Sequence, residues 1–268
     1  MNTFDYQRPT NVADAVAALK STPDGRALAG GQSLLPTMKL GLSAPELLVD
    51  LSRVDGLVGI SRSGNSLRIG AMTSHAAVAA SAEVQRAIPA LALLAGGIGD
   101  PGIRQRGTIG GSLATNDPAA CYPAALLALD GVVHTDRRKI AAGDFLVGLY
   151  QTALEPDELI TAVEFPIPSR AGYVKFLQPA SRFALVGVFV ASSDRGVRVA
   201  VTGAAACAFR AEALEKALSA NWAAASCRKV AIAADGLNTD LHASASYRAH
   251  LISVLSARAV EQADSAAA

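Results

Sequence analysis

Two short segments of this sequence combine paired glycines with small hydroxyl side chains: AGGQS at residues 29–33 and GTIGGS at residues 107–112. Paired glycines carry no Cβ atoms to block a close approach, and they permit turns in which successive N–H groups converge on an anion. One such turn after a strand is common and needs no ligand. Two of them predict one phosphate-bearing ligand held by backbone amides. The hydroxyl donors beside them belong to Ser33, Thr108, Ser112 and Thr115.

A dinucleotide site of the Rossmann type is the nearest alternative reading of the first segment. Asp50 ends a predicted strand about 20 residues after Gly30, where an acid that binds ribose is expected. However, the stretch AGGQSLLP lacks the three-glycine spacing of that motif, and Pro36 interrupts the helix that should receive the pyrophosphate. The sequence also contains no P-loop motif of the form G-x-x-x-x-G-K-[ST].

The cysteines and histidines predict no metal site. The three cysteines, Cys121, Cys207 and Cys227, are far apart and form no C-x-x-C pair. Such a scattered set is typical neither of a disulfide framework nor of an iron–sulfur or zinc site. With only four histidines in the chain, a metal centre of its own is not expected. Any redox chemistry here would therefore need an organic cofactor.

Composition indicates a globular protein. Of the 268 residues, 51% are apolar and 18% are charged, which is typical of a chain with a substantial core. The formal net charge is +1 and there is no long basic run, so nucleic-acid binding is not expected. The N-terminus does not resemble a signal peptide, and no apolar run approaches the roughly 18 residues of a membrane span. We expect a cytoplasmic protein.

The elements around the first glycine segment form a small α/β unit. Asn11 is a good N-cap, and Val12, Val16 and Leu19 follow at helical spacing. Strands are predicted at RALAGG and ELLVDL. The next part is mixed: the strands LVGIS and SLRIGA form a hairpin, and alanine-rich helices follow. Further on we expect a helix at AALLALDG and strands at GVVHT and ELITAVEFPIP.

A boundary is predicted at PIPSRAG, residues 166–172. Beyond it, YVKFLQ, LVGVFVASS and VRVAVTG predict a three-stranded antiparallel sheet, followed mainly by helices. In the last helix, Tyr247, Leu251, Val254 and Leu255 predict a stripe that faces the core. The predicted class is α+β, with a first domain at residues 1–168 (subdomains 1–55 and 56–168) and a second at residues 169–268.

Three stretches together resemble the FAD-binding medium subunit of the molybdenum hydroxylase family, which includes xanthine dehydrogenase and carbon monoxide dehydrogenase. They are LAGGQSLLPTMKLGL, IGDPGIRQRGTIGGSLATNDPAACYPAAL and ADGLNTDLHASASYRAHLISVLSARAV. The resemblance runs over nearly the whole chain, in the same order and at the same spacing. It implies an FAD-binding domain of the PCMH type at residues 1–168, followed by a C-terminal domain like that of the carbon monoxide dehydrogenase flavoprotein.

The resemblance also implies a site for FAD. The segment from Leu28 to Leu35 would wrap the diphosphate with its amides, and residues 108–112 would clamp the diphosphate and ribityl chain from the other side. Ile98 and Ile160 would pack near the rings, and Lys175 would lie close to the isoalloxazine, where its charge favours the reduced form. The implied contacts are Leu28, Ala29, Gly30, Gly31, Gln32, Ser33, Leu34, Leu35, Ile98, Thr108, Ile109, Gly110, Gly111, Ser112, Thr115, Ile160 and Lys175.

Two positions depart from the family pattern. Cys121 stands where many relatives carry Asp or Glu, and a thiol accepts hydrogen bonds less well than a carboxylate. Thr115 and Asn116 stand where several relatives carry His-Ala. The first departure weakens one expected contact to the polar chain of the flavin, and neither alters the glycine segments.

By the same resemblance, this chain transfers electrons and contains no catalytic residue of its own. The chain has neither the cysteines for [2Fe-2S] clusters nor the length for a molybdopterin domain. The resemblance therefore implies two partners, a small iron–sulfur subunit and a large molybdopterin subunit. The complex would be a dimer of heterotrimers. Electrons would leave to an external acceptor. The alternatives are a free-standing flavoprotein oxidase acting on a small substrate, and a scaffold that binds no FAD.

Overall fold

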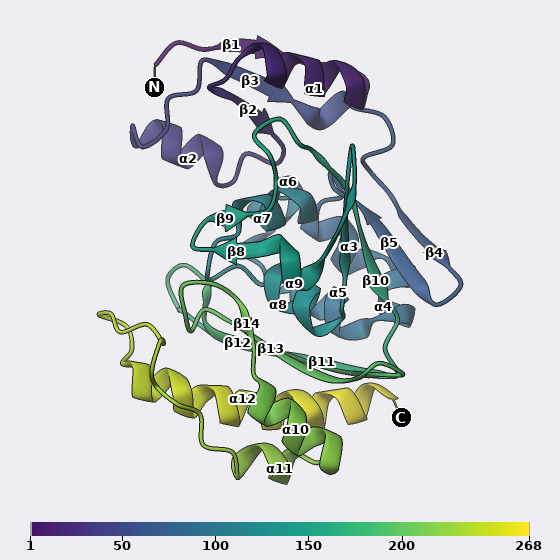
Figure 1. Cartoon of the computed structure of the whole chain (residues 1–268), viewed down its shortest axis with the longest axis vertical. Coiled ribbons are helices and arrows are strands. Elements are labelled where there is room, and N and C mark those ends of the chain that lie inside the picture. Colours follow the sequence, from purple (N-terminus) through teal and green to yellow (C-terminus); the bar gives the residue numbers. More distant parts are fainter. Residues whose placement is uncertain (1, 268) are drawn as a thin grey trace.

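A computed structural model describes residues 2–267 of the chain. It contains a three-stranded, a five-stranded and a four-stranded sheet together with one short hairpin, and helices accompany each of the three sheets. Figure 1 shows the N-terminal unit at one end of the molecule and the C-terminal sheet and helices at the other, with the five-stranded unit between them. The predicted α+β class is confirmed.

The N-terminal unit is a parallel sheet in the order β1-β3-β2. Asn11 caps its first helix by accepting a hydrogen bond from the backbone N–H of Asp14, as the sequence predicted. In the parallel pair of β2 and β3, Leu28 lies opposite Asp50, so the carboxyl ends of both strands meet at one edge. The segment 29–33 begins at this edge. The elements are β1 (Asp5–Gln7), α1 (Val12–Ser21), β2 (Gly25–Leu28), α2 (Leu34–Lys39), β3 (Leu47–Asp50) and the 3-10 helix η1 (Leu51–Arg53).

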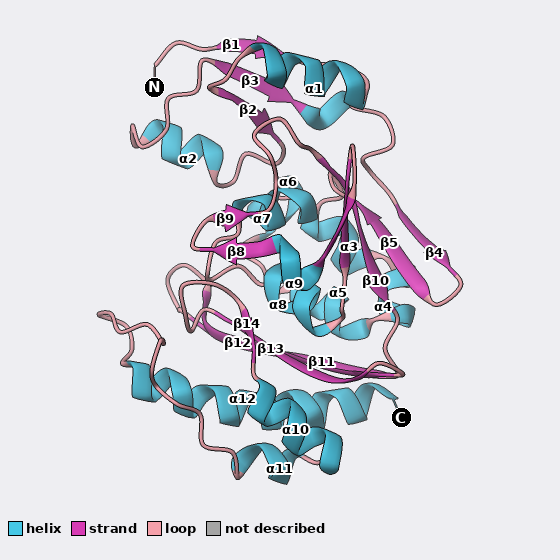
Figure 2. Ribbon diagram, viewed as in Figure 1, coloured by secondary structure: helices cyan, strands magenta, loops and turns pink. Residues whose placement is uncertain are grey.

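The central unit is an antiparallel sheet in the order β4-β5-β10-β6-β7, with helices packed on one face (Figure 2). Leu67, Val133 and Phe165 point from the strands into the same core as Leu91 and Leu126 of the helices. The strands are β4 (Ile60–Ser63), β5 (Ser66–Gly70), β6 (Val132–Thr135), β7 (Lys139–Ala141) and β10 (Ile160–Pro166). The helices are α3 (His75–Ala80), α4 (Ala82–Ala87), α5 (Pro89–Gly96), α6 (Pro101–Arg106), α7 (Ile109–Thr115), α8 (Tyr122–Ala128) and α9 (Ala142–Phe145), and the hairpin is β8 (Leu146–Gly148) and β9 (Gln151–Thr152).

The C-terminal unit is an antiparallel sheet in the order β11-β12-β13-β14, with the long helix α12 against one face (Figure 1). Three of its strands match the three predicted ones; β14 has only two residues and was missed because so short a strand leaves no periodic pattern. The elements are β11 (Arg170–Leu177), β12 (Ala184–Ser193), β13 (Gly196–Thr202), β14 (Phe209–Arg210), α10 (Glu212–Ala220), α11 (Ala224–Arg228) and α12 (Ala245–Ala267).

The side chains of β12 serve two cores. Phe189 and Ala191 pack with the helices of the central unit, whereas Val188 and Val190 pack toward α12. The core of the central unit therefore continues across the predicted boundary at residue 168. The division into domains at that residue stays a prediction. None of the helices within residues 2–267 is long and apolar enough to cross a membrane.

The closest approach between β11 and α12 depends on a glycine. A Cβ atom on Gly172 would lie 1.9 Å from the carbonyl oxygen of Ala259. We expect Gly172→Ala to lower the free energy of unfolding by about 2 kcal/mol, as overpacking in a core does. The measurement is urea denaturation, with Gly143→Ala as the control, since a Cβ at Gly143 meets nothing within 4 Å. Equal stability of the two variants would contradict this packing.

Candidate functional site

The structure brings the two glycine segments into direct contact. A Cβ atom on Gly30 would lie 2.1 Å from the carbonyl oxygen of Arg106 and 2.7 Å from the Cα of Gly107. A Cβ atom on Gly111 would lie 3.3 Å from the Cβ of Ala29. Only glycine permits the approach at position 30, because any side chain would collide with backbone. The segments are thus placed as a single shared ligand requires.

The first segment has free backbone donors. Among the hydrogen bonds within residues 2–267, none has the N–H of Gly30, Gly31, Gln32 or Ser33 as its donor. Gly31 has a φ of 71°, which turns the chain into α2, and the N–H of Leu35 then donates to the carbonyl of Gly31. Gln32 and Ser33 are exposed. Unpaired amides at an exposed turn can bind an anion, so this part of the predicted site has the donors it needs.

The second segment differs from its prediction because most of it is the start of a helix. Thr108 is the N-cap of α7, and its hydroxyl accepts from the N–H of Gly111 at 3.1 Å. The N–H of Gly110 donates to Ala71, and that of Ser112 to the carbonyl of Thr108. The amides of residues 110–112 are therefore paired within the protein. Their donation to a diphosphate stays a prediction; besides these paired amides, the segment offers side-chain hydroxyls and a surface without Cβ atoms.

The three residues predicted to lie near the rings of FAD, Ile98, Ile160 and Lys175, occupy two different places in the structure. Ile160 is buried in the core at the start of β10, behind Ala71, whose N–H bonds the carbonyl of Thr161. Ile98 is half-buried in the turn between α5 and α6. Lys175 reaches the same turn, because its Nζ donates to the carbonyl of Gly97 at 2.8 Å. Ile98 and Lys175 are thus brought together, and Ile160 lies deeper.

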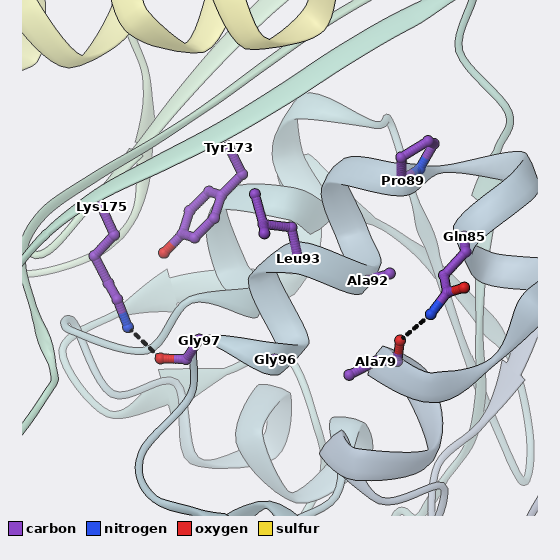
Figure 3. Close-up of a pocket in the computed structure, with 9 residues that line it drawn as sticks. All are labelled: Ala79, Gln85, Pro89, Ala92, Leu93, Gly96, Gly97, Tyr173 and Lys175. Carbon is purple, nitrogen blue, oxygen red and sulfur yellow. Dashed lines mark hydrogen bonds between the residues drawn. The ribbon is translucent and has the colours of Figure 1, made fainter. Parts of the chain in front are cut away.

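Lys175 is not a simple exposed strand lysine. Besides Gly97, its Nζ donates to the carbonyl of Arg182 at 2.9 Å and lies 3.6 Å from the Sγ of Cys121. Figure 3 shows its bond to Gly97 and the adjacent ring of Tyr173, at an open hollow of about 630 Å³. The sequence did not identify Gly97 or Arg182 as partners of this lysine. The other residues that line the hollow are Ala79, Gln85, Pro89, Ala92, Leu93 and Gly96.

Asp50, the ribose-binding acid of the Rossmann alternative, is engaged within the N-terminal unit. The hydroxyl of Tyr6 donates to its carboxylate, the N–H of Ser52 donates at 2.8 Å, and Arg8 forms an ion pair at 3.3 Å. Burial raises the pKa of Asp50, but these hydrogen bonds and the charge of Arg8 outweigh burial, so its pKa is lowered. The carboxylate is held by the protein itself, which argues against a ribose contact.

Pro36 does not break the helix after the first segment, in contrast to the sequence-based expectation. It lies in the first turn of α2, which begins at Leu34. A helix has no partner for its first backbone N–H groups, so a proline there loses no hydrogen bond.

Two side chains support the second segment from behind. Arg104 donates from Nη1 to the carbonyls of Ile98 and Gly99, at 3.0 and 2.8 Å, and so fixes the turn before α6. His75 is buried against Gly107, where an added Cβ would lie 2.6 Å from its Nε2. Burial, together with the charge of Arg104, lowers the pKa of His75 to about 4. Packing against Gly107 accounts for the position of His75.

No group of three or more His, Cys, Asp or Glu side chains within residues 2–267 is arranged to hold a metal ion. All three cysteines are free; Cys121 and Cys227 are buried and Cys207 is half-buried.

The lowered pKa of His75 leads us to expect that the free energy of unfolding falls in acid. Its pKa of about 4 in the folded chain lies below the ordinary value of 6.5. The unfolded chain therefore binds the proton more readily, so the free energy of unfolding falls as the pH drops from about 6.5 toward 4. Between pH 7 and 5 this amounts to about 2 kcal/mol. Urea denaturation at both pH values should show that His75→Gln loses this dependence and that His250→Gln, at an exposed position, keeps it.

The chain matches the family described as "FAD binding domain in molybdopterin dehydrogenase" over residues 2–168. It is 36% identical to the nicotine 6-hydroxylase medium subunit of Paenarthrobacter nicotinovorans over 272 residues, which cover 96% of each chain. It is 44% identical to the carbon monoxide dehydrogenase medium chain of Afipia carboxidovorans over 171 residues, 62% of this chain and 59% of that one.

Solved structures agree with this. The fold is similar to a chain of carbon monoxide dehydrogenase from Hydrogenophaga pseudoflava, with a TM-score of 0.91 and 35% identity over 100% of this chain and 99% of that chain. Quinoline 2-oxidoreductase from Pseudomonas putida 86 gives a TM-score of 0.89 and 30% identity, with the same coverage. The chain therefore belongs to the FAD-binding family of the molybdopterin dehydrogenases, as a medium-subunit type of oxidoreductase flavoprotein.

Proposed function

We propose that this chain is the FAD-binding, electron-transferring subunit of a molybdenum hydroxylase complex, and that FAD lies across the two glycine segments. The observation that carries this is the contact of Gly30 with Arg106 and Gly107, beside a row of unpaired amides. A diphosphate fits such a place because it offers oxygen acceptors and two negative charges to converging N–H groups.

The two glycine segments would make different kinds of contact with FAD. The amides of Gly30, Gly31, Gln32 and Ser33 would hold the diphosphate. Half-buried apolar side chains next to them would cover the less polar parts of the cofactor. From the other side the contacts would come from the segment 108–112, through its hydroxyls and through Gly110 and Gly111, which place no Cβ atom between the backbone and the cofactor. The proposed contacts that are half-buried are Leu28, Ala29, Leu34, Leu35, Ile98, Ser112 and Thr115, and those that are buried are Thr108, Ile109 and Ile160.

Bound FAD supplies the redox chemistry, and the protein supplies position and charge. Lys175 would lie close to the isoalloxazine, since its ammonium group is fixed to the turn that also contains Ile98. A cation there favours the more negatively charged, reduced cofactor. The proposal places no catalytic acid, base or nucleophile in this chain.

The chain would work with partners. Two relatives are named as medium subunit or medium chain, which implies smaller and larger companions in their complexes. We propose a small subunit with [2Fe-2S] clusters as electron source and a large molybdopterin subunit that selects and hydroxylates the substrate, assembled as a dimer of heterotrimers in the cytoplasm. An external acceptor takes the electrons. We further propose that the FAD-binding domain ends near residue 168.

Expression of the chain with its two genomic neighbours tests this function. The expected result is a yellow complex containing one FAD per chain, iron–sulfur absorption and molybdenum, in which substrate reduces the FAD only when all three subunits are present. Turnover of a small substrate by the isolated yellow chain would point to a free-standing oxidase instead. A colourless chain that takes up no FAD would refute the proposal.

Gly111→Asp tests the position of the diphosphate. A Cβ there faces Ala29, so the new carboxylate would lie between the two segments. Two unit charges about 4 Å apart repel by about 4 kcal/mol at an effective dielectric of 20, which should raise the FAD dissociation constant about a thousandfold. Gly111→Asn is the matched neutral control, measured by the same fluorescence titration.

Misfolding would not produce this difference between the FAD dissociation constants of the Asp and Asn variants. Position 111 is in the first turn of α7, where a negative charge favours the helix. Equal affinities of the Asp and Asn variants for FAD would remove the diphosphate from this location.

A further inference from the structure

The ammonium group of Lys175 is surrounded by neutral acceptors. Its three N–H donors correspond to three contacts: the carbonyl oxygens of Gly97 and Arg182 and the sulfur of Cys121. No carboxylate within residues 2–267 forms an ion pair with it. The lysine is held in one place, but its positive charge is not compensated.

The side chains nearest this charge are buried. Cys121 is 5% exposed and Tyr173 is 4% exposed. The Tyr173 hydroxyl has no hydrogen-bond partner among the described residues. Burial raises the pKa of Tyr173, and the neighbouring Cys121 acts in the same direction, so the phenol stays neutral. Lys175 itself is half-buried at the open hollow, so solvent screens its charge only in part and the charge still acts on a group bound close by.

This cluster is connected to the glycine segments by a short path. Lys175 binds the turn at Gly97, Arg104 of α6 binds the same turn at Ile98 and Gly99, and α6 ends at Arg106, which contacts Gly30. The six residues of α6 span about 9 Å. The lysine therefore lies within reach of a cofactor whose diphosphate rests on the first segment.

We infer that Cys121 is a positioning residue that sets the reduction potential of the bound FAD. As the one side chain within residues 2–267 that forms a hydrogen bond with the ammonium group of Lys175, the thiol fixes this group without cancelling its charge. A carboxylate at position 121 would form an ion pair with Lys175 and remove the net positive charge from the ring site. This inference rests on the proposed function.

Three single variants of the full chain with bound FAD test it by redox titration. Cys121→Asp should shift the equilibrium toward oxidised FAD at least tenfold, which corresponds to about 30 mV for a two-electron couple. Cys121→Asn introduces a neutral side chain of the same size as aspartate and should leave the reduction potential of the FAD unchanged. Lys175→Met should lower the potential about as much as Cys121→Asp, because each removes one net positive charge.

The outcomes separate this inference from the proposed function. An unmodified chain without FAD refutes the function. Retained FAD with equal potentials in Cys121→Asp and Cys121→Asn overturns the role of Cys121. An equally lowered potential in both variants also overturns it, since packing and not charge would then be responsible. Should Cys121→Asp not fold, Cys121→Glu and its neutral control Cys121→Gln are judged by the same criterion.

Discussion

The contact between Gly30 and the Arg106–Gly107 peptide is the constraint on which the site depends. It joins the edge of a parallel sheet to the end of α6, and nothing larger than a hydrogen atom fits between them. Three other features of the structure accompany this contact. Gly31 must turn the chain away at positive φ, Thr108 must cap α7 at once, and His75 must fill the space behind Gly107. The first segment, whose amides are free, is half-buried at Gly30 and Gly31 and exposed at Gln32 and Ser33.

Polar contacts are divided between the two segments in a way that suits one anion. The amides of the second segment form hydrogen bonds with Thr108, which caps the same helix, and with Ala71. These bonds hold the segment in one conformation. The first segment keeps its amides free. A ligand bound here would therefore receive most of its backbone hydrogen bonds from residues 30–33. Lys175, fixed through Gly97 to the turn before α6, adds the only charged group argued to act at the site.

Local signals in the sequence were sufficient for much of the fold. The cap at Asn11, the hairpin of β4 and β5 and the three long strands of the last sheet are set by neighbouring residues, so the sequence predicted them. The amide of Gly110 pairs with Ala71, which is distant in the sequence, so this pairing could not be predicted. The composition of GTIGGS alone suggests a loop, whereas Thr108 begins a helix.

The stripe predicted in α12 is confirmed at Leu251 and Leu255, which are buried, but is wrong at Tyr247. Tyr247 is 43% exposed, while its neighbour Arg248 is 2% exposed. The guanidinium of Arg248 donates to the carbonyls of Leu185 and Gly203 and to Asp240, and these acceptors make its burial possible. A rule based on apolar spacing counts Tyr247 as core and Arg248 as surface, because it cannot see acceptors that come from other elements.

The core that runs unbroken from the central unit into β11 and β12 has a mechanical consequence. Interiors packed to crystal-like density compress little, and units that share such a core do not hinge as loosely linked ones do. The spacing between Lys175 and the second glycine segment, whose Ile109 belongs to this core, is then a fixed dimension of the framework. A ligand bound between Lys175 and this segment would therefore keep its distance from the ammonium group without any closing movement.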